Sequence, residues 1–89
     1  MPEITLTVNH EVGLHARPAA LFVQTAKQFN CSIKVTHDEK EANAKSILSV
    51  LALGVEQGAV ITISTKGKDA DQALEALEAL IESNFGERE

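Results

Sequence analysis

The stretch VITISTK, residues 60–66, decides the fold class of this chain. Its apolar residues Ile61 and Ile63 alternate with Thr62 and Ser64, which is the pattern of a strand with one buried side and one solvent-facing side. Strands of this kind are typical of antiparallel sheets that are covered on one face only. The stretch therefore predicts an antiparallel sheet with one open face.

Other segments supply the partners of this strand. Residues 3–8 and 32–36 alternate in the same way, and each is expected to form a half-buried strand. Residues 40–43 form a short polar segment whose charges suit the edge of a sheet.

Three helices are expected between these strands. Apolar residues at helical spacing predict the first over about residues 16–28 and the third over about residues 70–84. A short apolar segment, residues 47–53, forms the second. The order β-α-β-β-α-β-α predicts a two-layer α+β fold, with one antiparallel sheet and three helices.

The third helix carries the main acidic group of the chain. Asp69 and Gln72 match a capping box at its start. The acidic residues along the helix and after it are expected to form an ordinary solvated face and tail; they are Glu75, Glu78, Glu82, Glu87 and Glu89.

Length and composition set the class of protein. The 89 residues, of which 44% are hydrophobic, suffice for one small domain with a modest core, expected over residues 1–89. The single cysteine, Cys31, excludes an internal disulfide and suits a reducing compartment. The chain shows neither a signal peptide nor an apolar run long enough to span a membrane. A cytoplasmic protein without a membrane partner is expected.

The charge, the aromatic content and the spacing of residues argue against several kinds of site. A net charge of −5, with three phenylalanines as the only aromatic residues, argues against nucleic acid as a partner. The histidines at positions 10, 15 and 37 are scattered, so no metal site is predicted. Residues 54–58 lack the Lys-Ser/Thr pair of a nucleotide-binding loop. No cofactor is expected.

The motif Gly-Leu-His-Ala-Arg-Pro-Ala, residues 13–19, points to function instead. Pro18 suits the first turn of a helix, where no backbone N–H is needed, and Gly13 permits a tight turn before it. His15 therefore lies at a helix N-terminus, where partial positive charge and unpaired N–H groups attract anions.

This arrangement suits phosphate. The backbone N–H groups of Ala16 and Arg17 are the expected donors, and the Arg17 guanidinium adds a permanent cation with a geometry suited to phosphate oxygens. The same positive field favours a neutral His15 imidazole, whose lone pair could accept a phosphoryl group and release it again. A lone histidine before a helix is also compatible with a cap or an ordinary surface residue.

The motif resembles the active site of HPr proteins, the phosphocarriers of the bacterial phosphoenolpyruvate-dependent sugar phosphotransferase system, and the resemblance covers nearly the whole chain. It implies that His15 accepts phosphate on Nδ1 from enzyme I and donates it to sugar-specific enzyme IIA, with Arg17 steadying the phosphate. It also implies an open-faced sandwich with four strands. The protein would be a monomer and a carrier, and not itself an enzyme.

The second helix is too apolar to be buried all round. If Val50 faces the core, Ile47, Leu48 and Leu51 form an exposed patch of the kind that marks a partner site. A helix sunk deeper into the fold is the alternative. The resemblance favours docking of enzyme I and enzyme IIA on this patch, together with the matching positions on the first helix, which are Ala20, Gln24 and Lys27.

Ser46 has two interpretations. As the N-cap of the second helix it is fully explained. The segment Lys45–Leu48 also resembles the regulatory segment of HPr proteins from low-GC Gram-positive bacteria, where a kinase/phosphorylase modifies this serine. That resemblance implies a further link to a catabolite control transcription regulator. A purely regulatory HPr-like protein, in catabolite control or in the nitrogen-related branch, is the alternative to a sugar-transport carrier.

Overall fold

The computed structural model describes residues 2–87, which form four strands, three α-helices and one short 3₁₀ helix. In chain order these are β1 (Glu3–Thr7), α1 (Ala16–Ala26), β2 (Cys31–His37), β3 (Lys40–Asn43), α2 (Ile47–Ala52), β4 (Val60–Gly67), α3 (Ala70–Glu82) and η1 (Asn84–Gly86). The order of strands and α-helices is the one that the sequence predicts, and η1 after α3 is an additional element.

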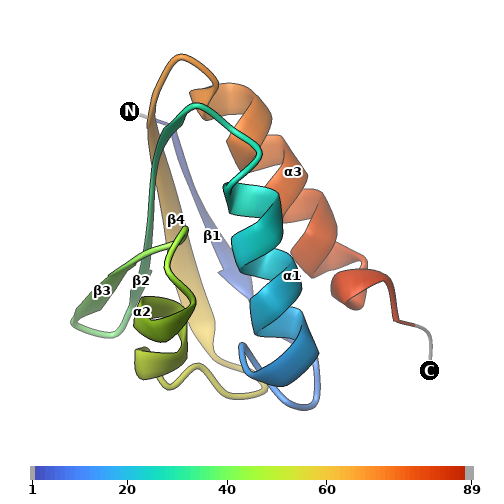
Figure 1. The fold of residues 1–89 in the computed structure, drawn as a ribbon. Helices are drawn as coiled ribbons and strands as arrows, with labels where there is room; N and C mark the ends of the chain where they lie inside the picture. Colours follow the sequence, from blue (N-terminus) through green and yellow to red (C-terminus); the bar gives the residue numbers. More distant parts are fainter. Residues whose placement is uncertain (1, 88–89) are drawn as a thin grey trace.

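The strands form one antiparallel sheet in the order β1-β4-β2-β3. The strand over residues 60–66 is central, with Ile63 paired to Ile4 on one side and to Val35 on the other. The polar strand β3 lies at an edge, as its charges predict. All three helices cover the same face of the sheet (Figure 1), so the predicted open-faced α+β fold is confirmed.

The core lies between the sheet and the helices. Ile61, Ile63 and Val35 of the sheet are buried against Phe22 of α1 and Leu77 of α3. The opposite face of the sheet carries hydroxyl side chains that contact one another, such as Thr5 and Thr62 at 3.1 Å. Cys31 is free and half-buried. Within residues 2–87, no helix has both the length and the apolar character needed to cross a bilayer.

The ends of all three helices and one cap differ from expectation, since α2 ends at Ala52 and α3 at Glu82, one and two residues before their predicted ends. Helix α1 ends at Ala26, two residues before the predicted end. The predicted capping box of α3 is wrong: the Asp69 side chain makes no cap hydrogen bond, and its Oδ2 accepts instead from the backbone N–H of Asn30 at 2.7 Å. Tertiary contact with the loop before β2 thus takes the carboxylate away from its own helix.

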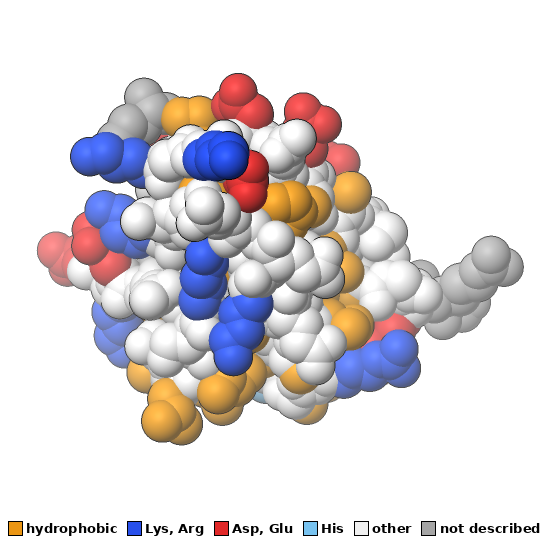
Figure 2. All heavy atoms as spheres, turned by 45° about the horizontal axis from the view of Figure 1, so that its top comes forward, with side chains coloured by type: hydrophobic (Ala, Val, Ile, Leu, Met, Phe, Trp, Pro, Cys, Tyr) orange, Lys and Arg blue, Asp and Glu red, His pale blue; other side chains and the backbone are white. Residues whose placement is uncertain are grey.

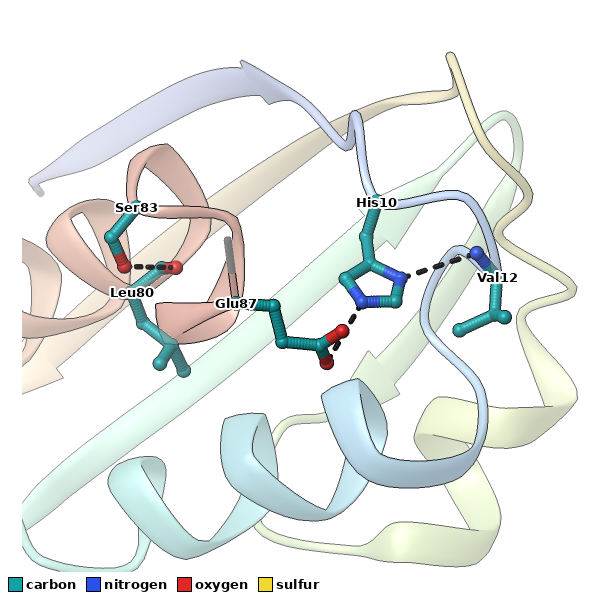
Figure 3. Close-up of polar contacts among 5 residues, drawn as sticks. All are labelled: His10, Val12, Leu80, Ser83 and Glu87. Atoms are coloured by element: carbon teal, nitrogen blue, oxygen red, sulfur yellow. Dashed lines mark hydrogen bonds and ion pairs between the residues drawn. The ribbon is translucent and has the colours of Figure 1, made fainter. Parts of the chain in front are cut away.

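A buried histidine joins the C-terminal segment to the loop after β1 (Figure 3). His10 is 5% exposed, its Nδ1 accepts from the backbone N–H of Val12 at 3.2 Å, and its Nε2 lies 2.9 Å from Oε2 of Glu87. Its ring packs edge-on against Phe85. Glu87 is therefore not part of a solvated tail, and that expectation is wrong; Glu89 lies outside the described residues.

Candidate functional site

The loop before α1 is held tightly against the loop after α2. The backbone N–H of Leu14 donates to the carbonyl of Val55 at 3.0 Å. Gly13 has a φ of +69°, and a Cβ at this position would lie 2.2 Å from the Val55 carbonyl oxygen and 2.8 Å from the Glu56 Cα. Only glycine fits both the backbone conformation and the close approach, so Gly13 fixes the position of the residues that follow.

His15 is the N-cap of α1, in extended conformation, and its side chain is 34% exposed. The next residue, Ala16, has a φ of +51°, which is uncommon for a residue other than glycine. A left-handed residue followed by a helical one turns successive backbone N–H groups toward a common point, the geometry of an anion-binding nest. This feature could not be predicted from the sequence, because alanine rarely adopts a positive φ.

The donors at this helix end are available. Neither the N–H of Ala16 nor that of Arg17 has a hydrogen-bond partner among residues 2–87. Pro18, which is buried, has no N–H, and Ala19 donates only to the His15 carbonyl at 3.4 Å. The Arg17 side chain is exposed and forms no ion pair with another described residue. Two N–H groups and one guanidinium are thus free to bind an anion beside His15.

Glu56 belongs to this site and was missed by sequence reasoning. Its Oε2 lies 2.8 Å from Nε2 of His15, although 41 residues separate the two in sequence. The only signal was an acidic residue within the glycine-bounded loop of residues 54–58, a segment for which the sequence only excluded a nucleotide-binding loop. The other ring nitrogen of His15, Nδ1, has no partner in the part of the chain that the structure describes.

Helix α2 presents the apolar surface that its sequence predicts. Val50 is fully buried, whereas Ile47, Leu48 and Leu51 are 40%, 77% and 37% exposed. The alternative of a deeply sunk helix is therefore wrong. Figure 2 shows hydrophobic side chains gathered at the lower left of the surface, where Figure 1 places α2. We call Ile47, Leu48 and Leu51 the α2 patch.

Helix α1 contacts α2 and extends the same surface. Gln24 and Lys27 are exposed, and Ala20 is half-buried. The three residues are spaced by four and three positions, so they share one side of the helix. They and the α2 patch therefore belong to neighbouring helices, of which α1 begins and α2 ends at the same end of the sheet (Figure 1), where the loop after α2 contacts the loop that carries His15.

Ser46 is the N-cap of α2, as predicted. Its Oγ accepts from the backbone N–H of Ser49 at 3.3 Å, and its carbonyl accepts from Val50 N–H at 3.0 Å. The serine is half-buried and adjoins the α2 patch.

Among the described residues there is no cluster of three or more His, Cys, Asp or Glu side chains that could hold a metal ion. Two surface hollows are lined by residues of β2, β3 and β4 and by Lys45, and His15 lines neither of them. The His15 side chain is 34% exposed and can therefore be reached by another protein.

Comparison with known proteins shows the family of this chain. A family model described as the PTS HPr component phosphorylation site matches residues 2–83. The chain belongs to the HPr family. Members of this family are phosphocarriers of the phosphotransferase system, and not catalysts in the usual sense.

Individual relatives are similar over their whole length. The chain is 46% identical to the HPr-like protein Crh of Halalkalibacterium halodurans, over 92% of this chain and 98% of the relative. A crystal structure of an HPr protein from Thermoanaerobacter tengcongensis is 52% identical, covers 100% of both chains and has a TM-score of 0.98. An HPr dimer from the same organism is 53% identical, covers 98% of this chain and 100% of that chain, and has a TM-score of 0.79.

Proposed function

We propose that this chain is a phosphocarrier that takes a phosphoryl group from enzyme I on Nδ1 of His15 and passes it to enzyme IIA. The observation that carries the proposal is the half-exposed His15 imidazole with an unpartnered Nδ1, beside the free N–H groups of Ala16 and Arg17. The helix N-terminus and the Arg17 guanidinium would stabilise the phosphate charge on the ring.

The chemistry needs no metal ion or nucleotide bound to the chain itself. The imidazole nitrogen is a nucleophile with its own lone pair, so it needs no activating base, unlike a serine hydroxyl. The open surface around His15 lets a phosphorylated donor protein and an acceptor protein reach the ring in turn. The chain is then a substrate of both partners.

Incubation with enzyme I and phosphoenolpyruvate tests this function. We expect one phosphate per chain, labile in acid and stable in base, which peptide mapping locates on His15. Transfer of that phosphate to an enzyme IIA protein should follow. A chain that remains unphosphorylated by enzyme I would refute the carrier role and leave the regulatory alternative.

The regulatory alternative is supported by the similarity to a Crh protein. A regulatory protein that its partner recognises only by the phosphorylation state of Ser46 would not need a phosphate-accepting histidine. This chain keeps His15, Arg17 and the free N–H groups together. That combination favours the carrier role over a purely regulatory one in catabolite control or nitrogen metabolism.

The α2 patch, with Ala20, Gln24 and Lys27 of α1, is the proposed docking surface for enzyme I and enzyme IIA. Leu48 is 77% exposed, so Leu48→Glu buries no charge and should change the free energy of unfolding by about 0.5 kcal/mol or less. We expect it to weaken enzyme I binding clearly, because a carboxylate would enter an apolar contact. Calorimetric titration with enzyme I and thermal unfolding measure the two effects.

The control for docking is Val60→Glu, which places the same charge on another exposed apolar side chain, 53% exposed at the start of β4. It should bind enzyme I like the parent chain. A melting temperature that collapses in Leu48→Glu, or equal weakening in both variants, would contradict docking on the α2 patch.

Ser46 is proposed as a regulatory phosphorylation site for an HPr kinase/phosphorylase, read by a catabolite control transcription regulator. Ser46→Asp keeps a cap acceptor at the positive end of α2, so stability should be unchanged or slightly higher. Its negative charge beside the α2 patch should slow phosphorylation of His15 by enzyme I, most clearly at low salt. Ser46→Ala should lower the free energy of unfolding by about 1 kcal/mol and keep the transfer rate.

These two variants separate the cap from the regulatory role. Rapid quench of the enzyme I reaction gives the transfer rate, and urea unfolding gives the stability. Equal transfer rates for Ser46→Asp and the parent chain at low salt would leave Ser46 as a structural cap.

We also propose that residues 1–89 act as one HPr-like domain, as a monomer in the cytoplasm. The site around His15 is formed by residues of one chain, so a second copy of the chain is not needed to complete it. Sedimentation at concentrations used for phosphotransfer tests the monomer, and a dimer that transfers phosphate at the same rate would refute only the oligomeric state.

A further inference from the structure

The contact between His15 and Glu56 is the part of the site that phosphate binding does not by itself require. Oε2 of Glu56 lies 2.8 Å from Nε2 of His15, which is hydrogen-bond distance. An ionised carboxylate can only accept a hydrogen bond, so the hydrogen between these atoms belongs to Nε2. A neutral His15 ring bonded in this way carries its lone pair on Nδ1.

Hydrogen bonds of the residues on both sides of Glu56 hold it near the ring. Before it, Val55 accepts from the Leu14 N–H at 3.0 Å, next to the close approach of Gly13. After it, the Gln57 side chain donates to the carbonyl of Asn9 at 3.2 Å. The Glu56 side chain is 75% exposed, yet its backbone is tied to the loop that carries His15.

We propose that Glu56 is a positioning residue for His15: it selects the tautomer with hydrogen on Nε2 and thereby presents the Nδ1 lone pair to the phosphoryl group. The inference rests on the proposed function. The carboxylate also covers Nε2, so one nitrogen is offered to the phosphorylated donor and the other is withheld. Carboxylates orient functional imidazoles in this manner in metal sites and catalytic triads.

The transfer balances without any movement of the Nε2 proton. The Nδ1 lone pair forms the N–P bond while the bond from phosphorus to the donor protein breaks, and its electron pair stays on the donor. The His15 ring gains a positive charge, which the Glu56 carboxylate offsets. In the onward step the N–P bond breaks, its electron pair returns to Nδ1, and the ring is neutral again.

The tautomer can be measured without any phosphotransfer. Nitrogen-15 NMR of the labelled, unphosphorylated chain, at a pH where histidine side chains are neutral, reports which ring nitrogen carries the hydrogen. We expect Glu56→Ala to shift the His15 tautomer ratio toward Nδ1–H by roughly fivefold, the effect of losing one hydrogen bond to an exposed carboxylate. Glu56→Gln keeps an acceptor oxygen and should restore most of the parent ratio.

Glu75→Ala is the matched control, because it removes an exposed carboxylate of α3 and should leave the His15 ratio unchanged. An identical His15 tautomer ratio in Glu56→Ala and the parent chain would overturn the inference. This outcome is independent of enzyme I, so a chain that accepts no phosphate would refute the proposed function alone.

A single-turnover assay with saturating phosphorylated enzyme I gives the second readout. Saturation separates the transfer step from docking, since Glu56 is exposed and could also touch the partner. Glu56→Ala should transfer roughly 10-fold more slowly, comparable to removal of the carboxylate behind a metal-binding histidine, and Glu56→Gln, which keeps the acceptor oxygen but loses the charge, should lie between Glu56→Ala and the parent. A Glu56→Ala rate equal to the parent rate would also overturn the inference.

Discussion

Replacing His15 with alanine should abolish phosphate transfer from enzyme I to this chain. The methyl group has no lone pair for the phosphoryl group, and no other imidazole lies beside the free N–H groups of α1. His15 and Glu56 are both partly exposed, so loss of their contact should change the free energy of unfolding by about 0.5 kcal/mol or less. Intact-mass measurement after incubation with enzyme I and phosphoenolpyruvate should find one phosphate on the parent and none on the variant.

His37→Ala serves as the matched control for that loss. It removes a different, half-buried imidazole and should accept phosphate at the parent rate. Phosphate that persists in His15→Ala, or that peptide mapping finds on His10 or His37, would contradict the assignment of His15.

Gly13→Ala should have the largest effect on stability, lowering the free energy of unfolding by about 3 kcal/mol or more. The added Cβ would lie 2.2 Å from the Val55 carbonyl oxygen and 2.8 Å from the Glu56 Cα. Both neighbours are backbone atoms, so the clash can be relieved only by separating the two loops. That separation also breaks the hydrogen bond from Leu14 to Val55. Urea-induced unfolding measures the change.

Gly54→Ala isolates the cause of this loss. Gly54 has a φ of +68°, nearly the same as that of Gly13, but an added Cβ would meet nothing within 4 Å. It should cost only about 1–2 kcal/mol, the usual penalty of a left-handed backbone for alanine. If the two variants lose equal stability, the positive φ is responsible and the close approach of the loops is not.

Most of the fold could be predicted from local patterns. Alternation in residues 60–66 correctly predicted that one sheet face is buried, because the side chains of a strand point alternately to opposite faces. The exposed apolar side of α2 followed from its composition, since a six-residue helix in a two-layer fold has only one side to bury. These conclusions depend on neighbouring residues only.

The three acidic residues that were misjudged or missed all contact distant parts of the chain. Asp69 suits a capping box by sequence, but the N–H of Asn30 takes its carboxylate. Glu87 reads as a tail residue, but it pairs with the buried His10. Glu56 reaches the functional histidine only because two loops meet. No periodicity reports such contacts, since they arise from the path of the backbone in space.

The buried His10 described above can be compared with the other two histidines, and the comparison bears on the proposed choice of His15 as phosphate acceptor. In each of them, Nε2 lies within hydrogen-bond or ion-pair distance of a carboxylate. The pairs are His10 with Glu87 at 2.9 Å, His15 with Glu56 at 2.8 Å, and His37 with Asp38 at 3.6 Å.

The three rings differ at the other nitrogen. Nδ1 of His10 accepts from the Val12 N–H, and Nδ1 of His37 faces the Val60 carbonyl at 3.4 Å. Only in His15 does Nδ1 lack a partner within residues 2–87. The backbone thus occupies the reactive nitrogen of two imidazoles that are chemically identical to the third. In the proposed carrier, selectivity for His15 then comes less from activation of its ring than from the backbone contacts that occupy Nδ1 of the other two histidines.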